Sequence, residues 1–193
     1  MIIDGRVVEP LTEDRFEDVT TVLGKGGIGG CWCMYWSRPS SKAWAEGARG
    51  GSKARNRETF LERVRQGPPP GLILYVDEHP AAWCRVMARS ELPGLAASRY
   101  FKTDLDIDGV WSLPCFVVRR EYRGRGLTEI LIRAAVELAR SQGAGIVEAY
   151  PWDTSERKAD SVVYTGLAST FDRLGFDVVQ RLASHKPMMR LKL

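Results

Sequence analysis

The order of the predicted elements places this chain in the mixed α/β class. A short run with β-branched and aromatic residues, Cys115–Val118, predicts a strand and comes directly before a glycine-containing turn and a long amphipathic helix. Two hairpins are also predicted, one from Leu72–Val76 and Ala81–Ala88, the other from Phe176–Leu182 and Lys186–Leu191. Strands that alternate with helices in this way favour one sheet with helices packed against it.

Two helices are predicted before the first hairpin. Over Asp14–Leu23 the apolar residues share one side of a helix. A second helix is predicted over Arg55–Gln66, and the run Pro68–Pro70 prevents its continuation. These patterns assign residues 1–70 to helices and loops, and residues 71–193 to the sheet with its helices.

The segment between the two hairpins predicts a strand, a helix and a second strand. The first strand spans Gly109–Val118, the helix ends at Ser141–Gly143, and the second strand spans Ile146–Tyr150. A last helix is predicted over Thr165–Leu174, whereas Glu91–Asp108 is expected to be a polar surface loop. The apolar residues of the long helix recur at steps of three and one on one face: Leu127, Ile130, Leu131, Ala134, Ala135, Leu138 and Ala139.

Length and composition are those of an ordinary globular protein. The 193 residues suit one domain, with 44% hydrophobic and 27% charged residues. No apolar run approaches the roughly 18 residues that cross a membrane, and the first residues lack the pattern of a signal peptide. We therefore expect a single domain over residues 1–193, a cytoplasmic location and no membrane partner.

The placement of cysteine and histidine argues against a metal site. The four cysteines, Cys31, Cys33, Cys84 and Cys115, form no C-x-x-C pair, and neither histidine is near them in the sequence. We expect reduced thiols and no metal. The net charge of +4 is moderate and no zinc-finger spacing or aromatic–glycine RNA motif is present, so no nucleic-acid partner is expected.

The turn before the long helix has the features of a phosphate site. The run Arg123–Thr128 holds two arginines and two glycines between an apolar strand and the start of a helix. Unpaired N–H groups and the positive end of a helix attract an anion, and glycines allow it to approach the backbone. The sequence therefore predicts a ligand that carries a phosphate or pyrophosphate group.

A second glycine-rich segment, Gly24–Gly30, offers a competing site. It fits the G-x-G-x-x-G pattern and is close to a Walker motif, which would indicate a nucleotide-binding protein. A Walker motif requires Lys-Ser or Lys-Thr at its end, but Gly30 and Cys31 occupy these positions, and a helix rather than a strand is predicted before it. We expect a loop beside a substrate pocket that could move as substrate enters.

The phosphate-type turn belongs to a longer pattern. Arg123 and Gly126 match an Arg-x-x-Gly-x-Gly/Ala turn, with Thr128 in place of the last residue, and Phe171–Phe176 is similar to a Tyr-x-x-x-Gly-Phe helix ending. With the strand and helix around the turn, the pattern from Leu72 to the C-terminus resembles the GNAT superfamily of acyl-CoA N-acyltransferases. The resemblance implies a central, twisted, mostly antiparallel sheet that splays between two strands and is flanked by helices.

The resemblance implies an N-acetyltransferase that uses acetyl-CoA and no metal. Such an enzyme transfers the acetyl group to a primary amine, here of an unidentified small molecule or peptide, by direct attack of the neutral amine. The family's frequent tyrosine, often the acid that reprotonates the leaving thiolate, corresponds to Phe171, which has no proton to give. This departure keeps a second function open, a non-catalytic acyl-CoA-binding module.

The resemblance assigns acetyl-CoA to two neighbouring segments. The end of the strand would bind the pantetheine arm and polarise the acetyl carbonyl with its backbone, and the turn would hold the pyrophosphate with its N–H groups. Arg123 either contacts the phosphates or braces the turn, and Thr128 could add a contact through its hydroxyl. The implied cofactor-binding residues are Phe116, Val117, Val118, Arg123, Gly124, Arg125, Gly126, Leu127, Thr128 and Phe171.

Three residues are candidates for moving protons. Glu148 lies on the strand after the long helix and Asp153 follows the end of that strand, so either carboxylate could act as general base. Tyr164 could replace the missing tyrosine as the acid. Each has a structural alternative: Glu148 as partner of a core arginine, Asp153 as a loop cap, and Tyr164 as a core residue beside a helix.

An aromatic cluster lies before the sheet, where this family usually builds its acceptor pocket. Trp32, Tyr35 and Trp36 could line a pocket for an apolar or cationic amine. The alternative is a hydrophobic cap over the sheet. The resemblance thus places the acceptor-side elements in residues 1–70 and the acyl-CoA-binding core in residues 71–193. The terminal hairpin could also pair with that of a second copy, which would give a homodimer.

Overall fold

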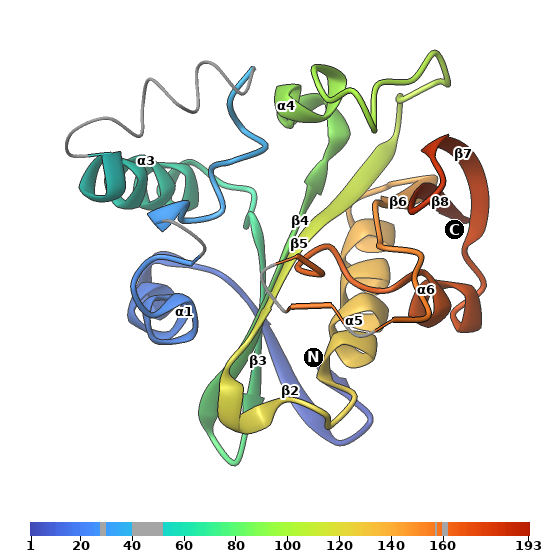
Figure 1. Ribbon diagram of the computed structural model, residues 1–193. Coiled ribbons are helices and arrows are strands. Elements are labelled where there is room, and N and C mark those ends of the chain that lie inside the picture. The colour runs from blue at the N-terminus through green and yellow to red at the C-terminus, as the bar shows by residue number, and fades with distance from the viewer. Residues whose placement is uncertain (28–29, 40–51, 157, 160–161) are drawn as a thin grey trace.

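The described residues form one eight-stranded sheet with helices on both faces (Figure 1). The computed structural model describes residues 1–27, 30–39, 52–156, 158–159 and 162–193. The strands lie in the order β1-β2-β3-β4-β5-β6-β8-β7, and all neighbours are antiparallel except β5 and β6, which are parallel. This confirms the mixed, mostly antiparallel sheet. The strands are β1 (Ile2–Ile3), β2 (Arg6–Pro10), β3 (Gly71–Val76), β4 (His79–Ala88), β5 (Val110–Val118), β6 (Ile146–Ala149), β7 (Asp177–Ala183) and β8 (Lys186–Lys192).

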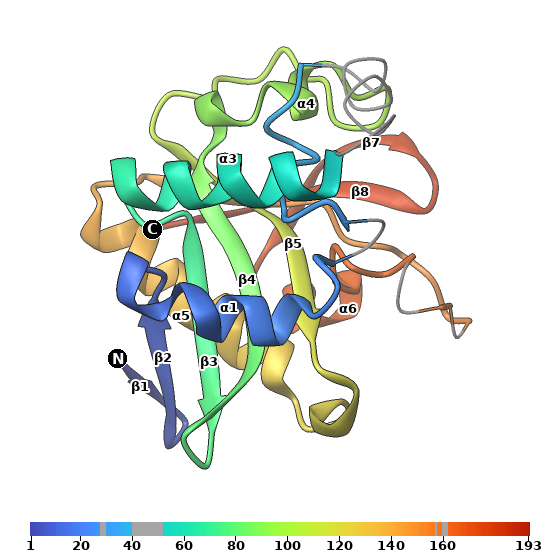
Figure 2. The ribbon, with the colours of Figure 1, turned by 90° about the vertical axis from the view of Figure 1, so that its left-hand side faces the viewer.

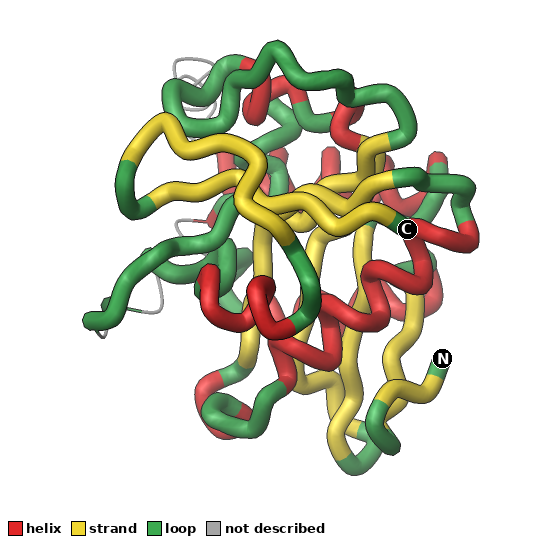
Figure 3. The backbone as a smooth tube through the Cα atoms, turned by 90° about the vertical axis from the view of Figure 1, so that its right-hand side faces the viewer, coloured by secondary structure: helices red, strands yellow, loops and turns green. Residues whose placement is uncertain are grey.

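The helices of the described segments lie in two layers. In Figure 2, α1 and α3 lie in front of β3, β4 and β5, and Figure 3 shows the opposite side, with α5, α6 and the β7–β8 hairpin. None of the described helices is long and apolar enough to cross a membrane. The helices are α1 (Phe16–Leu23), α3 (Ser52–Gln66), α4 (Pro93–Ala96), α5 (Leu127–Ser141) and α6 (Ala168–Arg173), with short 3-10 turns η1 (Glu13–Arg15), η3 (Arg89–Glu91) and η4 (Arg120–Tyr122).

The chain begins with two strands that the sequence patterns do not predict. β1 and β2 pair antiparallel around Asp4 and Gly5, whose φ angles are 47° and 73°, and β2 pairs in turn with β3. An Asp-Gly pair between apolar residues is a sequence signal for such a hairpin, but β1 has only two residues and so shows no alternation of its own. The sheet therefore starts near the N-terminus, and the assignment of residues 1–70 to helices and loops is wrong there.

Two other segments differ in detail from the prediction. The expected loop over 91–108 contains the short helix α4, which begins at Pro93, where a missing backbone N–H costs nothing. The last helix begins at Ala168 rather than at Thr165. Residues 28–29 of the glycine-rich segment lie outside the described residues.

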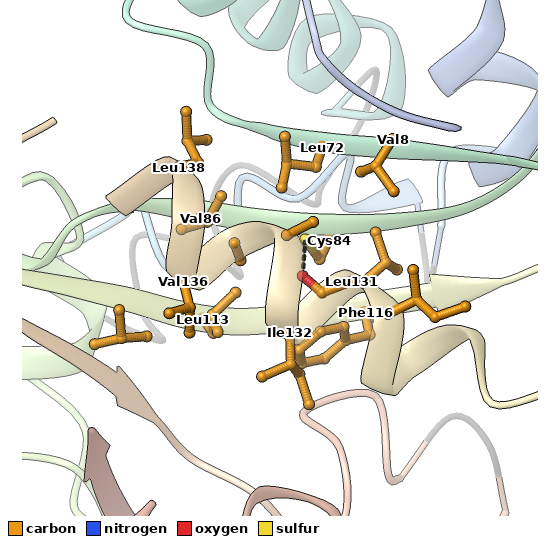
Figure 4. Close-up of a cluster of buried hydrophobic side chains, with 14 of the residues drawn as sticks. Val8, Leu72, Cys84, Val86, Leu113, Phe116, Leu131, Ile132, Val136 and Leu138 are labelled. Carbon is orange, nitrogen blue, oxygen red and sulfur yellow. Dashed lines mark hydrogen bonds between the residues drawn. The ribbon is translucent and has the colours of Figure 1, made fainter. Parts of the chain in front are cut away.

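The main core lies between α5 and the sheet. Figure 4 shows Leu131 of α5 close to Cys84 of the sheet, and the Sγ of Cys84 lies 4.0 Å from the carbonyl oxygen of Leu131. The whole predicted apolar face of α5 is buried, together with Ile132 and Val136 on its flank. The flank is buried because side chains of β1 and β8 also border the helix.

β5 and β6 separate part of the way along β5. They pair from Val110 with Ile146 to Leu113 with Ala149, and beyond this point β5 continues beside β4 as far as Val118. A proline, which has no N–H for a ladder hydrogen bond, follows Leu113 at the point of separation. Beyond Leu113, one edge of β5 is therefore no longer paired with β6. This is the separation of two strands that the family resemblance predicts.

Candidate active site

The turn that precedes α5 presents backbone N–H groups to an open surface. Gly124 and Gly126 have φ angles of 74° and 72°, and a Cβ at either position would meet nothing within 4 Å. In the described structure no acceptor takes the N–H groups from Gly124 through Thr128. These groups and the start of a 15-residue helix together favour an anion such as a pyrophosphate.

The two arginines of the turn have structural contacts. Arg123 Nε donates to the carbonyl oxygen of Val118 at 3.0 Å, which ties the turn to the end of β5. Arg125 Nη2 donates to the carbonyl oxygen of Glu121 at 3.1 Å, and its guanidinium lies over the ring of Tyr122, 5.4 Å from the centroid. Of the alternatives for Arg123, this geometry favours the brace.

A groove of about 560 Å³ runs along the end of β5, past the turn and the first turn of α5. The segment that joins β6 to α6 forms its other wall, with Tyr164 and Gly166 among the lining residues. The groove brings together most of the residues that the resemblance assigns to acetyl-CoA: Phe116, Val117, Val118, Arg123, Gly124, Gly126, Leu127 and Thr128. Arg125 is not among the lining residues.

Phe171 lies in the core, not in the groove. It is fully buried, and its ring packs against Phe116 at 6.1 Å and against Phe176 at 5.1 Å between centroids. A Cβ at Gly166 would approach the Phe171 ring to 2.8 Å, so the glycine makes room for it. A side chain without a hydroxyl gains most from complete burial, and the predicted cofactor contact of Phe171 is corrected to a packing role beneath the groove.

Tyr164 lies between the groove and a second cavity, because it lines both. Its carbonyl oxygen accepts a hydrogen bond from the N–H of Phe116 at 2.7 Å, on the edge of β5 that β6 has left. Burial is the main reason that the pKa of the Tyr164 hydroxyl lies above its ordinary value.

The second cavity, named here the aromatic pocket, has a volume of about 560 Å³. The segment after Cys33, the α4 region, the segment after β6 and the start of β8 all contribute to it. Its aromatic lining residues are Tyr35, Trp36, Tyr100, Phe101, Trp152 and Tyr164, and its basic ones are Arg38, Arg99 and Lys186. Trp32 is instead buried and stacked on Phe16 at 6.2 Å, so the predicted cluster divides between pocket and cap.

Lys186 is the pocket residue that sequence reasoning missed. Its side chain is nearly enclosed, with 8% exposed, and Nζ lies 4.1 Å from the centroid of the Trp152 ring. Burial lowers the pKa of the Lys186 ammonium to about 8. A lysine that starts a terminal strand is expected to be exposed, and no local pattern distinguishes this one.

Glu148 belongs to a buried ion-pair network. The carboxylate is completely buried, Oε1 accepts from Arg89 Nη1 at 2.5 Å and from the Tyr150 hydroxyl, and Oε2 accepts from Arg190 Nε at 2.7 Å. Both oxygens are engaged, and Glu148 lines neither the groove nor the aromatic pocket. Glu148 therefore has the structural role of partner to core arginines. A carboxylate with both oxygens engaged and no access to either cavity does not fit a general base.

Asp153 is an exposed loop residue. Its carboxylate pairs with Arg181 at 2.8 Å, and its backbone N–H donates to the carbonyl oxygen of His185 at 3.1 Å. These contacts connect the loop after β6 to the hairpin at the end of the chain. Asp153 lines neither cavity, so the expected position beside the acceptor amine is corrected to a loop anchor.

A buried thiol pair attaches the N-terminal segment to the sheet. Cys33 Sγ and Cys115 Sγ are 3.8 Å apart, and Trp83 Nε1 donates to Cys33 Sγ at 3.1 Å. The fully buried Arg85 donates to the carbonyl oxygen of Cys33 and to Ser37 Oγ. The hydrogen bond between the two thiols and the nearby Arg85 guanidinium lower the pKa of Cys33. These contacts position the residues that follow Cys33 at the aromatic pocket.

Comparison with known proteins places the chain in one family. The model of the acetyltransferase (GNAT) family matches residues 34–159, more than half of the chain. The chain belongs to this family and is an acyl-CoA-dependent acyltransferase. No curated protein matches the sequence.

Solved structures share the fold at low sequence identity. A GNAT family acetyltransferase from Listeria monocytogenes 4b F2365 is 12% identical with a TM-score of 0.60, over 100% of this chain and 99% of that one. YncA, a putative acetyltransferase from Salmonella typhimurium solved with its cofactor acetyl-CoA, is 13% identical with a TM-score of 0.55, over 97% and 94%. The Drosophila melanogaster polyamine N-acetyltransferase, which forms N-acetylagmatine, is 15% identical with a TM-score of 0.57, over 97% and 100%.

Replacement of Glu148 distinguishes a structural carboxylate from a catalytic one. Glu148→Gln leaves the buried Arg89 and Arg190 without their anion, so we expect the free energy of unfolding to fall by about 3–5 kcal/mol. Urea unfolding followed by circular dichroism measures this change. Glu137→Gln, which breaks an exposed pair with Arg140 at 2.5 Å, is the control and should change stability by less than about 0.5 kcal/mol. A Glu148→Gln protein with unchanged stability and no activity would contradict the structural role.

Proposed function

We propose that the protein transfers the acetyl group of acetyl-CoA to a primary amine of a small molecule or peptide by direct attack. The observation that supports this proposal is the meeting of the groove and the aromatic pocket at Tyr164. One cavity has the backbone groups that suit a pyrophosphate and a pantetheine arm. The other is concave, aromatic and open to a second substrate, which is typical of a small-molecule site.

The cofactor is proposed to lie along the groove. The free N–H groups of the turn would bind its pyrophosphate, and Arg123 would hold the turn against β5. The N–H of Phe116, which now donates to the Tyr164 carbonyl, is the proposed donor to a carbonyl of the acyl-pantetheine arm. In the complex it would exchange the Tyr164 carbonyl for the acyl carbonyl, and an N–H fixed on a strand is then an effective donor to a developing oxyanion.

The chemistry requires one bond to form and one to break. Bound acetyl-CoA supplies the acyl group as a thioester, the amine nitrogen bonds to the acyl carbon, and the bond from that carbon to sulfur breaks. The amine loses one proton and the leaving sulfur gains one. We assign the proton that the sulfur gains to the Tyr164 hydroxyl, which replaces the tyrosine that the family has at the position of Phe171. The proton that the amine loses returns to the Tyr164 oxygen through water, so the step is balanced.

The amine must be neutral when it attacks, and the aromatic pocket favours that form. Among its described lining residues there are three basic side chains and no carboxylate. Nearby positive charge lowers the pKa of a bound ammonium group, so the proton can leave to water. Glu148 and Asp153 have no part in this proposal, because their carboxylates are engaged elsewhere.

The expected homodimer stays a proposal. β7 is an edge strand of the sheet, and it exposes Val178, Val179 and Leu182. An exposed apolar edge strand is a surface that a second copy can cover by strand pairing. The chemistry proposed above needs only one copy.

Thiol release from acetyl-CoA tests the function directly. We expect micromolar binding of acetyl-CoA by titration calorimetry, and release of the CoA thiol with at least one member of a panel of amines, amino acids, polyamines and peptides. Binding with no thiol release across the panel would favour the non-catalytic acyl-CoA-binding module. A folded protein that does not bind acetyl-CoA would overturn both functions.

A negative charge in the first turn of α5 should weaken cofactor binding. Thr128→Glu places a carboxylate beside the proposed pyrophosphate site, and we expect the Kd for acetyl-CoA to rise about tenfold or more by calorimetry. The same change favours the helix itself, since acidic residues stabilise a helix N-terminus, so a loss of binding is not a loss of folding. Thr59→Glu on α3 is the matched control and should leave the Kd unchanged. An unchanged Kd in Thr128→Glu would place the pyrophosphate elsewhere.

Removal of the Tyr164 hydroxyl tests the proton donor. We expect Tyr164→Phe to lower kcat about 100-fold with little change in the KM for acetyl-CoA, because the ring keeps its packing and only the acid is lost. Steady-state thiol release measures both constants. The control is Tyr75→Phe on β3, which removes a hydroxyl that donates to Asp18 at 2.6 Å; this variant should leave kcat unchanged. Equal kcat values in Tyr164→Phe and the wild type would show that water provides the proton.

A further inference from the structure

The charge of the aromatic pocket is one-sided. Lys186, Arg38 and Arg99 line it, and no aspartate or glutamate does so in the described part of the chain. The remaining wall is largely aromatic, with Trp36, Trp152 and the residues around them. An acceptor with several ammonium groups would bring further positive charge to these side chains. An acceptor with an apolar body and an anionic group would complement both parts of the wall.

Lys186 is the most enclosed of the three cations. Its side chain is 8% exposed, and within the described residues its ammonium has no hydrogen bond and no ion pair, only the face of Trp152 at 4.1 Å. An ammonium group buried in this way is costly unless an anion or several acceptors bind it. The cation–π contact with one ring offsets only part of that cost. The pocket therefore holds a positive charge that lacks an anionic partner.

Two described carboxylates near the end of β6 have other partners. Glu148 binds Arg89 and Arg190 with its two oxygens, and Asp153 binds Arg181 at the surface. Trp36, another lining residue, also has a buried indole N–H with no acceptor among the described residues. The groups of the pocket that lack a partner are thus donors, and the missing group is an acceptor.

We infer that the acceptor is an amine that also carries a carboxylate on an apolar or aromatic body, and that Lys186 binds this carboxylate. The inference rests on the proposed function, since it names the class of amine. The aromatic walls would bind the apolar body, and the amine would lie toward Tyr164, where the pocket meets the groove. Lys186 is a specificity-determining residue in this arrangement and takes no part in the transfer of protons.

Matched pairs of acceptors test the inference. We expect free L-amino acids with apolar or aromatic side chains, such as phenylalanine and leucine, to be acetylated with a kcat/KM about 10- to 100-fold above that of their carboxamides. Lys186→Met should reduce this ratio to near one, while the Kd for acetyl-CoA stays that of the wild type. Lys186→Arg should restore part of the preference. Lys192→Met, which removes an exposed lysine from the same strand, should leave both unchanged.

A binding measurement separates this inference from the proposed function. Titration of the CoA-bound protein with N-acetylphenylalanine and with N-acetylphenylalaninamide requires no catalysis, and the acid should bind about 10- to 100-fold more tightly, with the difference lost in Lys186→Met. If this difference is found but no amine is acetylated, the carboxylate site stands and the acetyltransferase proposal fails. Equal binding of acid and amide, or an unchanged preference in a folded Lys186→Met protein, would overturn the inference.

Discussion

The geometry of the site depends on the separation of β5 and β6. Because their pairing ends after Leu113 and Ala149, the edge of β5 no longer has a strand beside it, and its backbone groups can bind something else. β6 carries Glu148, whose buried carboxylate pairs with Arg89, directly after β4, and with Arg190 on β8. Three buried charges are stable only when they are paired. This network therefore fixes the position of β6 and, with it, the two cavities.

The N-terminal part of the chain completes the site from the other direction. Cys33 contacts Cys115 on β5 and Trp83 on β4, and the buried Arg85 donates to the same segment. The wall of the aromatic pocket that contains Trp36 is consequently attached to the strand that also faces the groove. A buried guanidinium with backbone and hydroxyl acceptors is a rigid connection, because each lost hydrogen bond would leave a buried donor unsatisfied.

The two cavities owe their positive character to different sources. In the groove, backbone N–H groups at the start of α5 contribute to it beside the side chains of Arg123 and Arg173; the N–H groups carry no titratable charge and depend on conformation rather than on residue type. In the aromatic pocket it comes from side chains, above all Lys186. Binding of a cofactor by backbone and of an acceptor by side chains, as proposed, would allow chains with such different sequences to keep one fold.

The sequence by itself determined the local parts of this protein. The apolar face of α5 and the turn over Arg123–Thr128 follow from residue spacing within single segments. The tertiary structure decided the rest. Glu148 as an ion-pair partner and Lys186 as a pocket residue could not be derived from their neighbours in the chain. The physical reason is that the role of a charged group is set by the charges and the solvent around it, and distant segments supply both.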